Sequence, residues 1–259
     1  MTTDTPVLQV EDLSLTFSGV KALSEVSLVA PAGGLVAVIG PNGAGKTTLF
    51  NCISGVYRPD AGRVFLDGKD ITGMASWRVA RLGVARMFQN LALFEHLTVL
   101  DNLLLGRHVH YTSRWWHDAL WRGRTQAEEI RHRAQAETVI DFLDLTRYRR
   151  MPVGILPYGV LKRVELGRAL CAEPRLLLLD EPAAGLNQEE TEDMARYLLD
   201  VKEELGVTLV LIEHDLRFVL ELADSVTVLD FGRKVTDGPP DEVRRHPDVI
   251  TAYIGGGQA

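Results

Sequence analysis

The chain has 259 residues, 46% of them hydrophobic, which is enough to bury the core of one large domain or two small ones. Its 28 Lys and Arg against 35 Asp and Glu give a formal charge of -7, which argues against bulk electrostatic binding of nucleic acid. No apolar run approaches the roughly 20 residues that a membrane helix needs, and the N-terminus lacks the pattern of a secretory signal. Cys52 and Cys171 alone make no disulfide framework or zinc site. The composition predicts a cytoplasmic globular protein.

The first third of the chain carries short segments in which apolar and polar residues alternate, at 7–10, 14–17 and 27–29. A period of two is typical of strands with one buried face. Because these segments follow one another closely, they predict an antiparallel sheet.

A glycine-rich turn follows the LVAVI run of residues 35–39, which is typical of a strand buried on both faces. Residues 40–47, GPNGAGKT, fit the phosphate-loop pattern G-x-x-x-x-G-K-[ST], and the next residues can continue as a helix. Glycines let backbone N–H groups curl around phosphate oxygens, and the helix N-terminus adds partial positive charge. Lys46 supplies a full charge between the β- and γ-phosphates, and the Thr47 hydroxyl is a ligand for Mg²⁺. The predicted nucleotide-binding residues are Gly40, Pro41, Asn42, Gly43, Ala44, Gly45, Lys46, Thr47 and Thr48.

The segment from about residue 91 to 150 differs in kind, because it has helical spacing and no convincing buried strand. Three of the four tryptophans lie there, at Trp115, Trp116 and Trp121. Residues 107–150 hold nine Arg against six Asp and Glu, a local charge of +3, which leaves -10 on the rest of the chain. We expect a helical insertion whose Trp side chains, with Arg114 and Arg122, either face a partner or pack internally.

Two acids follow the LLLL run of residues 176–179, which predicts another buried strand. Ligands of parallel α/β sheets bind at the carboxyl ends of the strands, and Asp180 and Glu181 lie at such an end. Asp180 is suited to hold Mg²⁺ through its water shell, and Glu181 to polarise a water that attacks the γ-phosphate. Acids often simply end strands, but together with Lys46 and Thr47 they favour a catalytic site.

The last third predicts three more strands, at 208–212, 225–229 and 233–236. The first is the apolar run TLVLI, set between helical stretches, and the other two flank Phe231 and Gly232, a predicted hairpin turn. The alternation of strands and helices along the chain predicts an α/β fold.

These residues resemble an ATP-binding cassette (ABC) ATPase, and the resemblance covers nearly the whole chain. It implies a single ABC domain over residues 1–259, with a P-loop NTPase (RecA-like) core, an antiparallel β subdomain and a helical subdomain. The expected parts are residues 1–90 for the β subdomain and phosphate-loop core, and residues 91–165 for the helical subdomain. Residues 166–259 would form the remainder of the core with a C-terminal hairpin and helix.

The resemblance also implies roles for residues that carry little signal alone. Phe17 matches the aromatic side chain that stacks on adenine. Gln89 matches the glutamine that senses Mg²⁺ or the lytic water and joins the core to the helical insertion. His214 matches the switch histidine that contacts the γ-phosphate. Residues 184–187 match the loop that crosses the dimer interface, although many members have Asp where Asn187 stands.

The family's signature LSGGQ reads LPYGV here, at residues 156–160. In the family the signature Ser hydroxyl and a Gly N–H reach the γ-phosphate bound to the opposite subunit, and Pro157 has neither a hydroxyl nor an N–H. Gly159 and the helix behind it remain, and a helix N-terminus still favours an anion. We expect the site to function with one fewer hydrogen bond across the interface.

Several stretches are similar to the ATPase subunit of branched-chain (Leu/Ile/Val) amino-acid importers, among them LPYG, LLLLDEPAAGLN and HPDVITAYIG. That similarity implies a homodimer, or a heterodimer with a sibling ATPase, on the inner face of the cell membrane. It also implies transmembrane permease subunits and, indirectly, a periplasmic or extracellular amino-acid-binding protein, and no nucleic acid.

Three alternatives remain open from the sequence. The first is an ABC ATPase that energises transport of another substrate. The second is an ABC ATPase that acts on DNA or ribosomes, although the chain shows neither coiled coils nor zinc modules. The third is a P-loop kinase of small molecules, which would not need Gln89, Glu181, His214 and a signature helix together.

Overall fold

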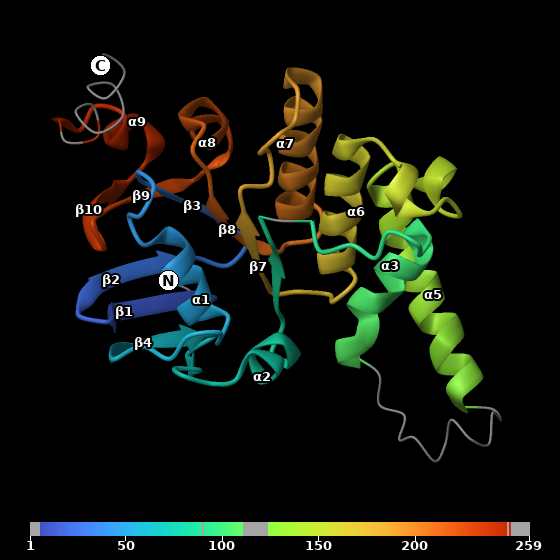
Figure 1. Ribbon diagram of the computed structural model, residues 1–259, viewed down its shortest axis with the longest axis horizontal. Coiled ribbons are helices and arrows are strands. Elements are labelled where there is room, and N and C mark those ends of the chain that lie inside the picture. Colours follow the sequence, from blue (N-terminus) through green and yellow to red (C-terminus); the bar gives the residue numbers. More distant parts are fainter. Residues whose placement is uncertain (1–5, 90, 111–123, 248, 250–259) are drawn as a thin grey trace, which may run out of the picture.

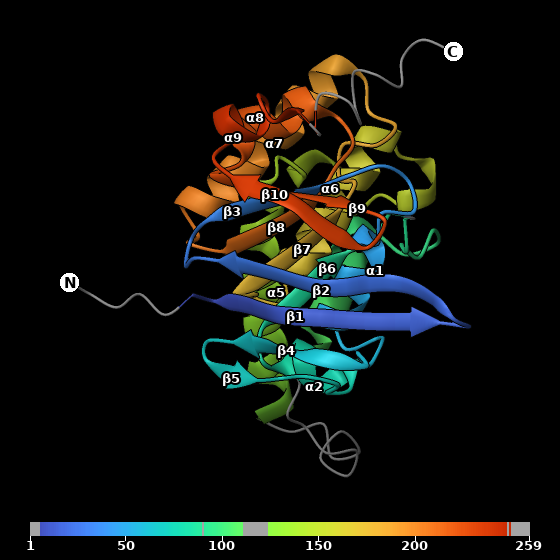
Figure 2. The same ribbon diagram turned by 90° about the vertical axis from the view of Figure 1, so that its left-hand side faces the viewer.

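Two β-sheets lie one above the other in the computed structural model, which describes residues 6–89, 91–110, 124–247 and 249 (Figures 1 and 2). The four-stranded antiparallel sheet has the order β2 (Val20–Ala30), β1 (Leu8–Phe17), β4 (Ala61–Leu66) and β5 (Lys69–Asp70). The six-stranded sheet has the order β10 (Arg233–Gly238), β9 (Ser225–Asp230), β3 (Leu35–Ile39), β8 (Thr208–Ile212), β7 (Leu176–Asp180) and β6 (Val84–Met87). Its strands are parallel except for β10, which closes a hairpin with β9. The predicted α/β fold, antiparallel sheet and hairpin are confirmed.

The strands of the antiparallel sheet are longer than the sequence predicts. β1 is one strand where we predicted two segments, and its pairing with β2 shifts register between Val10 and Leu13. Asp12 lies in this irregular stretch with a left-handed φ of 45°, so the alternation of apolar residues breaks while the strand continues. The sequence reading also missed β4, β5 and β6, because only two or fewer side chains of each are fully buried.

The central parallel strands are buried on both faces, as predicted. All five residues of β3, β7 and β8 are buried. In β3, Val36 and Val38 face a core shared with the antiparallel sheet, while Leu35, Ala37 and Ile39 face the opposite core. Helix α1 (Lys46–Ile53) follows the phosphate loop and contributes Leu49, Phe50 and Ile53 to the first of these cores. It therefore packs between the two sheets and holds the phosphate loop above β3.

Helices form the rest of the molecule, and those of the predicted helical region gather on one side (Figure 1). They are α3 (Val99–Gly106), η1 (Arg107–His110), α5 (Arg124–Phe142), η2 (Thr146–Tyr148), η3 (Val153–Ile155) and α6 (Tyr158–Leu170). The core also carries α2 (Ser76–Arg81), α7 (Gln188–Glu203), α8 (Leu216–Leu222) and α9 (Pro240–Val243). The predicted helical insertion is thus helical where it is described, and none of its described residues belongs to a named strand. Our division of the chain stays a prediction, and its boundary at 165/166 falls inside α6.

The predicted contacts of the insertion's tryptophans lie outside the described residues, which end at His110 and resume at Arg124. Among the helices that the structure describes, none has both the length and the apolar character to cross a membrane.

The parallel strands bring several predicted site residues to one edge of the sheet. Register pairs Met87 with Leu179, Asp180 with Ile212, and Val38 with Ile212. Because parallel strands point the same way, their carboxyl ends meet at one edge. The segments that follow these strands, which carry Gly40, Gln89, Glu181 and His214, therefore begin side by side.

Candidate functional site

The phosphate loop curls around the side chain of Lys46. Its Nζ donates to the carbonyl oxygens of Gly40 and Pro41, at 2.7 and 3.0 Å. Gly40 and Gly45 have φ of 154° and 100°, and a Cβ on either would lie 2.1 Å from the Leu229 oxygen or 2.5 Å from the Ala22 oxygen. Only glycine fits these close backbone approaches, so the two glycines of the pattern are required by packing as well as by conformation.

The loop offers a buried cation and an exposed hydroxyl to a phosphate. Lys46 is buried at the start of α1, and desolvation lowers its pKa, opposed by the charges of Glu181 and Asp180. Thr47 is exposed and Thr48 is half-buried. At the tip of the loop, Pro41, Asn42 and Gly43 are also exposed. Ala44 is buried and accepts a hydrogen bond from the Gly232 N–H, which fastens the loop to the β9–β10 turn. This arrangement suits the phosphates of a nucleoside triphosphate, which need a cation and hydrogen-bond donors.

Asp180 ends β7 with one carboxylate oxygen paired and the other unpaired. Its Oδ2 accepts from Arg86 Nη2 at 2.7 Å, and Arg86 Nη1 donates to Asn51 Oδ1 at 2.6 Å. Asp180 Oδ1 is buried and accepts no hydrogen bond within the described part of the chain. A buried, unpaired carboxylate oxygen beside the phosphate loop is suited to accept from a water on Mg²⁺, so these residues fit the metal that the motif implies.

Glu181 lies between two other predicted catalytic side chains. Gln89 Nε2 donates to Glu181 Oε2 at 2.8 Å, and His214 Nε2 lies 2.7 Å from Glu181 Oε1. The Glu181 side chain is 15% exposed and that of His214 is 40% exposed, so a ligand can reach both. The structure thus brings Gln89 and His214 to Glu181, although they lie 92 and 33 positions from it along the chain.

A second layer of charged residues surrounds Glu181, and the sequence reading missed it. Glu213 is buried at the end of β8 and accepts from the N–H groups of Ala183 and His214, and burial raises its pKa. Lys162 of α6 is fully buried and donates to the Glu181 carbonyl oxygen at 3.4 Å. Glu213 could have been found by the signal that identified Asp180, since it is also an acid at the end of an apolar strand. Lys162 and Arg86 carried no such signal.

The residues predicted to contact adenine and the opposite subunit come from β1 and from the start of α6. Phe17 ends β1 with 42% of its surface exposed and packs edge-on against Tyr57, with ring centroids 5.1 Å apart. Gly159 is buried in the first turn of α6, where an added Cβ would lie 2.3 Å from the Glu190 carboxylate. Its predicted contact with the opposite subunit's nucleotide stays a prediction.

Two departures from the family pattern stand at helix starts. Pro157 is the N-cap of α6 and makes no side-chain capping hydrogen bond. Asn187 is the N-cap of α7. Its side chain accepts a hydrogen bond from the Glu190 N–H, and the Glu190 carboxylate accepts one from the Asn187 N–H. Asn187 therefore caps a helix through hydrogen bonds and without charge, as expected of an amide at this position.

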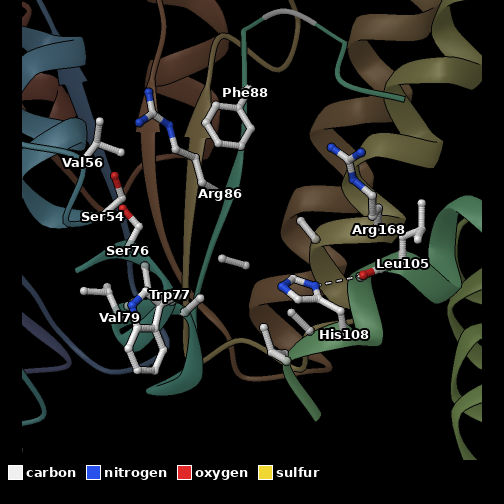
Figure 3. A pocket seen from close by; sticks show the side chains of 17 residues that line it. Ser54, Val56, Ser76, Trp77, Val79, Arg86, Phe88, Leu105, His108 and Arg168 are labelled. Atoms are coloured by element: carbon white, nitrogen blue, oxygen red, sulfur yellow. Dashed lines mark hydrogen bonds between the residues drawn. The ribbon is translucent and has the colours of Figure 1, made fainter. Parts of the chain in front are cut away.

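A groove separates the core from the helical region (Figure 3). Its volume is about 420 Å³, and its lining is mostly apolar. Trp77, Val56 and Phe88 lie along the core side, and Leu105 and Arg168 lie along the helical side. Phe88 directly precedes Gln89, so the groove adjoins the cluster of Gln89, Glu181 and His214.

Comparison with known proteins places the chain in a family. A model described as "ABC transporter" matches residues 23–184, and one described as "Branched-chain amino acid ATP-binding cassette transporter" matches residues 233–259. The chain is 39% identical to the high-affinity branched-chain amino acid transport ATP-binding protein BraF of Pseudomonas aeruginosa, over 96% of this chain and 98% of BraF. It is 36% identical to the probable branched-chain amino acid transport ATP-binding protein LivG of Archaeoglobus fulgidus, over 96% and 95%.

Solved structures agree with these relatives. The crystal structure of a nucleotide-free ATP-binding cassette from an ABC transporter superposes with a TM-score of 0.84 at 32% identity, covering 96% of this chain and 99% of that one. The ADP conformation of an ATP-binding cassette of an ABC transporter gives 0.84 at 31% identity, with the same coverage. The predicted fold class is confirmed. With a phosphate loop and a carboxylate cluster at one sheet edge, these likenesses show that the chain belongs to the ATP-binding cassette ATPases of the ABC transporter family.

Proposed function

We propose that this chain is the ATP-hydrolysing subunit of an importer that moves branched-chain amino acids through separate membrane subunits. The observation that carries the ATPase half of the proposal is the convergence of Gln89, Glu181 and His214 beside the phosphate loop. The substrate half is supported by the relatives named for branched-chain amino acid transport and by the match at residues 233–259. Within the residues that the structure describes we assign no amino-acid pocket, so the substrate is inferred from likeness.

The phosphate loop would hold the nucleotide. Lys46 and the backbone N–H groups of the loop would neutralise the phosphates, and Phe17 would stack on the adenine ring. Thr47, Gln89 and Asp180 would hold Mg²⁺, with Asp180 acting through a water. The metal, when bound, would offset negative charge that develops on the phosphate oxygens during transfer.

Glu181 would act as the general base for the attacking water. Its Oε2 accepts a hydrogen bond from Gln89, and its Oε1 contacts His214. A water that enters between these side chains would therefore meet a carboxylate whose two oxygens are both held in place. His214 would exchange its contact with Glu181 for the γ-phosphate, and Gln89 would report the change to the helical region. Lys46 lies near enough to Glu181 and Asp180 for their charges to act on its pKa, which supports a single reaction centre.

Two chains would associate head to tail, with the nucleotide between the phosphate loop of one and Gly159 of the other. The partner would be an identical chain or a sibling ATPase. ATP would then have different affinities for the open and closed pairs, and that difference is what allows ATP binding to drive closure. Closure would move α3 and α6 relative to the core.

The groove beside Gln89 would receive a helix of a permease subunit. Its apolar lining with Trp77 and Phe88 suits an amphipathic helix, and Arg168 in the lining suits an acidic side chain on that helix. This docking would place the chain on the inner face of the membrane, in the cytoplasm. A periplasmic or extracellular amino-acid-binding protein would act through the permease without contacting this chain.

Uptake of radiolabelled leucine into vesicles that carry the permease complex tests this proposal. We expect ATP-dependent leucine uptake with the wild-type chain, little uptake with Glu181→Gln, and competition by isoleucine and valine. Labelled arginine is the control substrate. Leucine uptake that is unaffected by Glu181→Gln, or uptake of arginine in place of leucine, would contradict the proposed function.

A further inference from the structure

Arg86 is a buried cation beside the carboxylate that we assign to magnesium. It lies in β6, and its side chain is 8% exposed, against 3% for Asp180. Nothing in the sequence marked it, because β6 itself was not predicted. A buried charge of this kind is costly unless it is paired, so its position calls for a specific role.

The guanidinium joins three elements of the site. Nη1 donates to Asn51 on α1, which follows the phosphate loop, and Nη2 donates to Asp180 at the end of β7. β6, which carries Arg86, leads three residues later to Gln89. The elements that would bind phosphate, metal and lytic water therefore share one side chain.

The guanidinium also contacts two aromatic rings. Its central carbon lies 5.6 Å from the centroid of the Phe50 ring and 5.0 Å from that of Phe88. The planar fork of Arg fixes the direction of both hydrogen bonds, and ring contacts restrict its rotation further. Lys in this place would keep the charge and lose the fork.

We propose that Arg86 is a positioning residue that fixes the rotamer of Asp180 for magnesium. Arg86 is the only side-chain donor to Asp180 within the described residues, and it occupies Oδ2. Oδ1 is thereby left as the oxygen available to a metal-bound water. This inference rests on the proposed metal role of Asp180. Outer-sphere partners that orient a metal-binding group commonly contribute 10- to 100-fold to metal affinity.

If Arg86 acted only through its charge, its removal would change the affinity for Mg²⁺ in the opposite direction. A cation near Mg²⁺ repels it, so removal of the charge alone would strengthen metal binding. Removal of a positioning group would weaken metal binding, because Asp180 would lose its side-chain donor and its fixed rotamer. The sign of the change separates the two roles.

The experiment compares ADP affinity in EDTA with ADP affinity in MgCl₂, for the full chain and its variants. For Arg86→Gln we expect the gain from Mg²⁺ to fall by about tenfold or more, with little change of affinity in EDTA. Arg86→Lys keeps the charge, so we expect a smaller loss of the gain from Mg²⁺. This variant replaces Arg86→Gln in the experiment if the Gln variant does not fold. The matched control is Arg175→Gln, since Arg175 pairs with Asp67 at 2.8 Å on the surface before β7 begins, and this variant keeps the wild-type gain.

Three results would overturn the inference. A folded Arg86→Gln chain with an unchanged or larger gain from Mg²⁺ contradicts the positioning role and leaves the proposed function intact. An equal loss in Arg175→Gln shows that the effect is not specific to the site. A wild-type chain with no gain from Mg²⁺ contradicts the metal role of Asp180 itself, and the inference with it.

Discussion

Glu181 occupies a backbone conformation that few glutamates adopt. Its φ of 52° is in the left-handed region, which costs free energy for a residue with a Cβ, of order 1 kcal/mol or more. Its N–H donates to the Ile212 carbonyl and its own carbonyl accepts from Lys162, so β8 and α6 hold the turn in place. The conformation turns the side chain toward Gln89 and His214, where the proposed chemistry needs it.

Pro157→Ser tests whether the altered signature limits the site. The substitution supplies a hydroxyl at the N-cap of α6, which has no side-chain cap at present. We expect ATP hydrolysis to be retained or modestly increased, because a missing hydrogen bond across the subunit interface would be restored. The measurement is the steady-state ATPase rate of the two chains at saturating ATP, and loss of activity in the Ser variant would refute this reading.

The phosphate loop, Asp180 and Glu181 could be placed from the sequence because each follows a strand that the apolar pattern marks. Asp180 and Glu181 follow LLLL, and the phosphate loop follows LVAVI. Arg86 and Lys162 could not be placed this way. Their roles depend on how β6 and α6 pack against β7, and that packing joins residues 94 and 19 positions apart.

At the scale of elements, burial on both faces was the reliable signal. β3 and β8 have the predicted bounds, since a run of apolar residues on both faces has no other stable place than the centre of a sheet. β4 and β6 were not predicted, because each has only two buried residues. Those residues are buried by segments that are distant in sequence, so the apolar pattern of the strand alone does not show their burial. β6 lies at the edge of its sheet, whereas β4 lies between β1 and β5.

Helix α6 carries a buried acid whose ionisation opposes stability. Burial raises the pKa of Glu165 from 4.5 to about 7, although the charges of Lys162 and Arg168 act to lower it. Between these pH values the folded chain binds a proton more tightly than the unfolded chain does. The contribution of Glu165 to the free energy of unfolding therefore falls as pH rises from about 4.5 to 7, on the order of 3 kcal/mol, and stays lower above that range.

Glu165→Gln removes this dependence because an amide carries no charge at any of these pH values. We expect the variant to become more stable relative to the wild type as pH rises from 5 to 8. Urea unfolding at both pH values measures the difference, with Glu203→Gln at the exposed end of α7 as the matched control. If the wild type and Glu165→Gln differ by the same amount at both pH values, the pKa of Glu165 is not raised.

At the scale of the molecule, the groove divides the two regions that closure would move (Figure 3). Val56→Arg places a charge on its apolar lining, and Val29→Arg makes the same change on β2, away from the groove. Both valines are 52% exposed, so the two variants are matched in burial. We expect Val56→Arg to reduce co-purification of permease subunits while ATP binding is unchanged. Equal co-purification of both variants would remove the groove from permease docking.

The charge of -7 is unevenly spread in the sequence, with a local excess of Arg in the helical region. Two of those arginines form ion pairs within the described part of the chain, Arg107 with Glu173 and Arg149 with Glu137. Their charges are therefore partly offset internally. The permease docking that we propose therefore uses the apolar groove and does not depend on an excess of basic charge.

We propose that this chain hydrolyses ATP with Glu181 as the base. The most direct test measures ATP binding and ATP hydrolysis on the same samples of wild type, Glu181→Gln and the exposed control Glu189→Gln, each in complex with permease subunits. We predict that Glu181→Gln binds ATP as the wild type does while its hydrolysis rate falls by about 100-fold or more, and that Glu189→Gln behaves as wild type. Hydrolysis by Glu181→Gln at the wild-type rate would contradict this proposal.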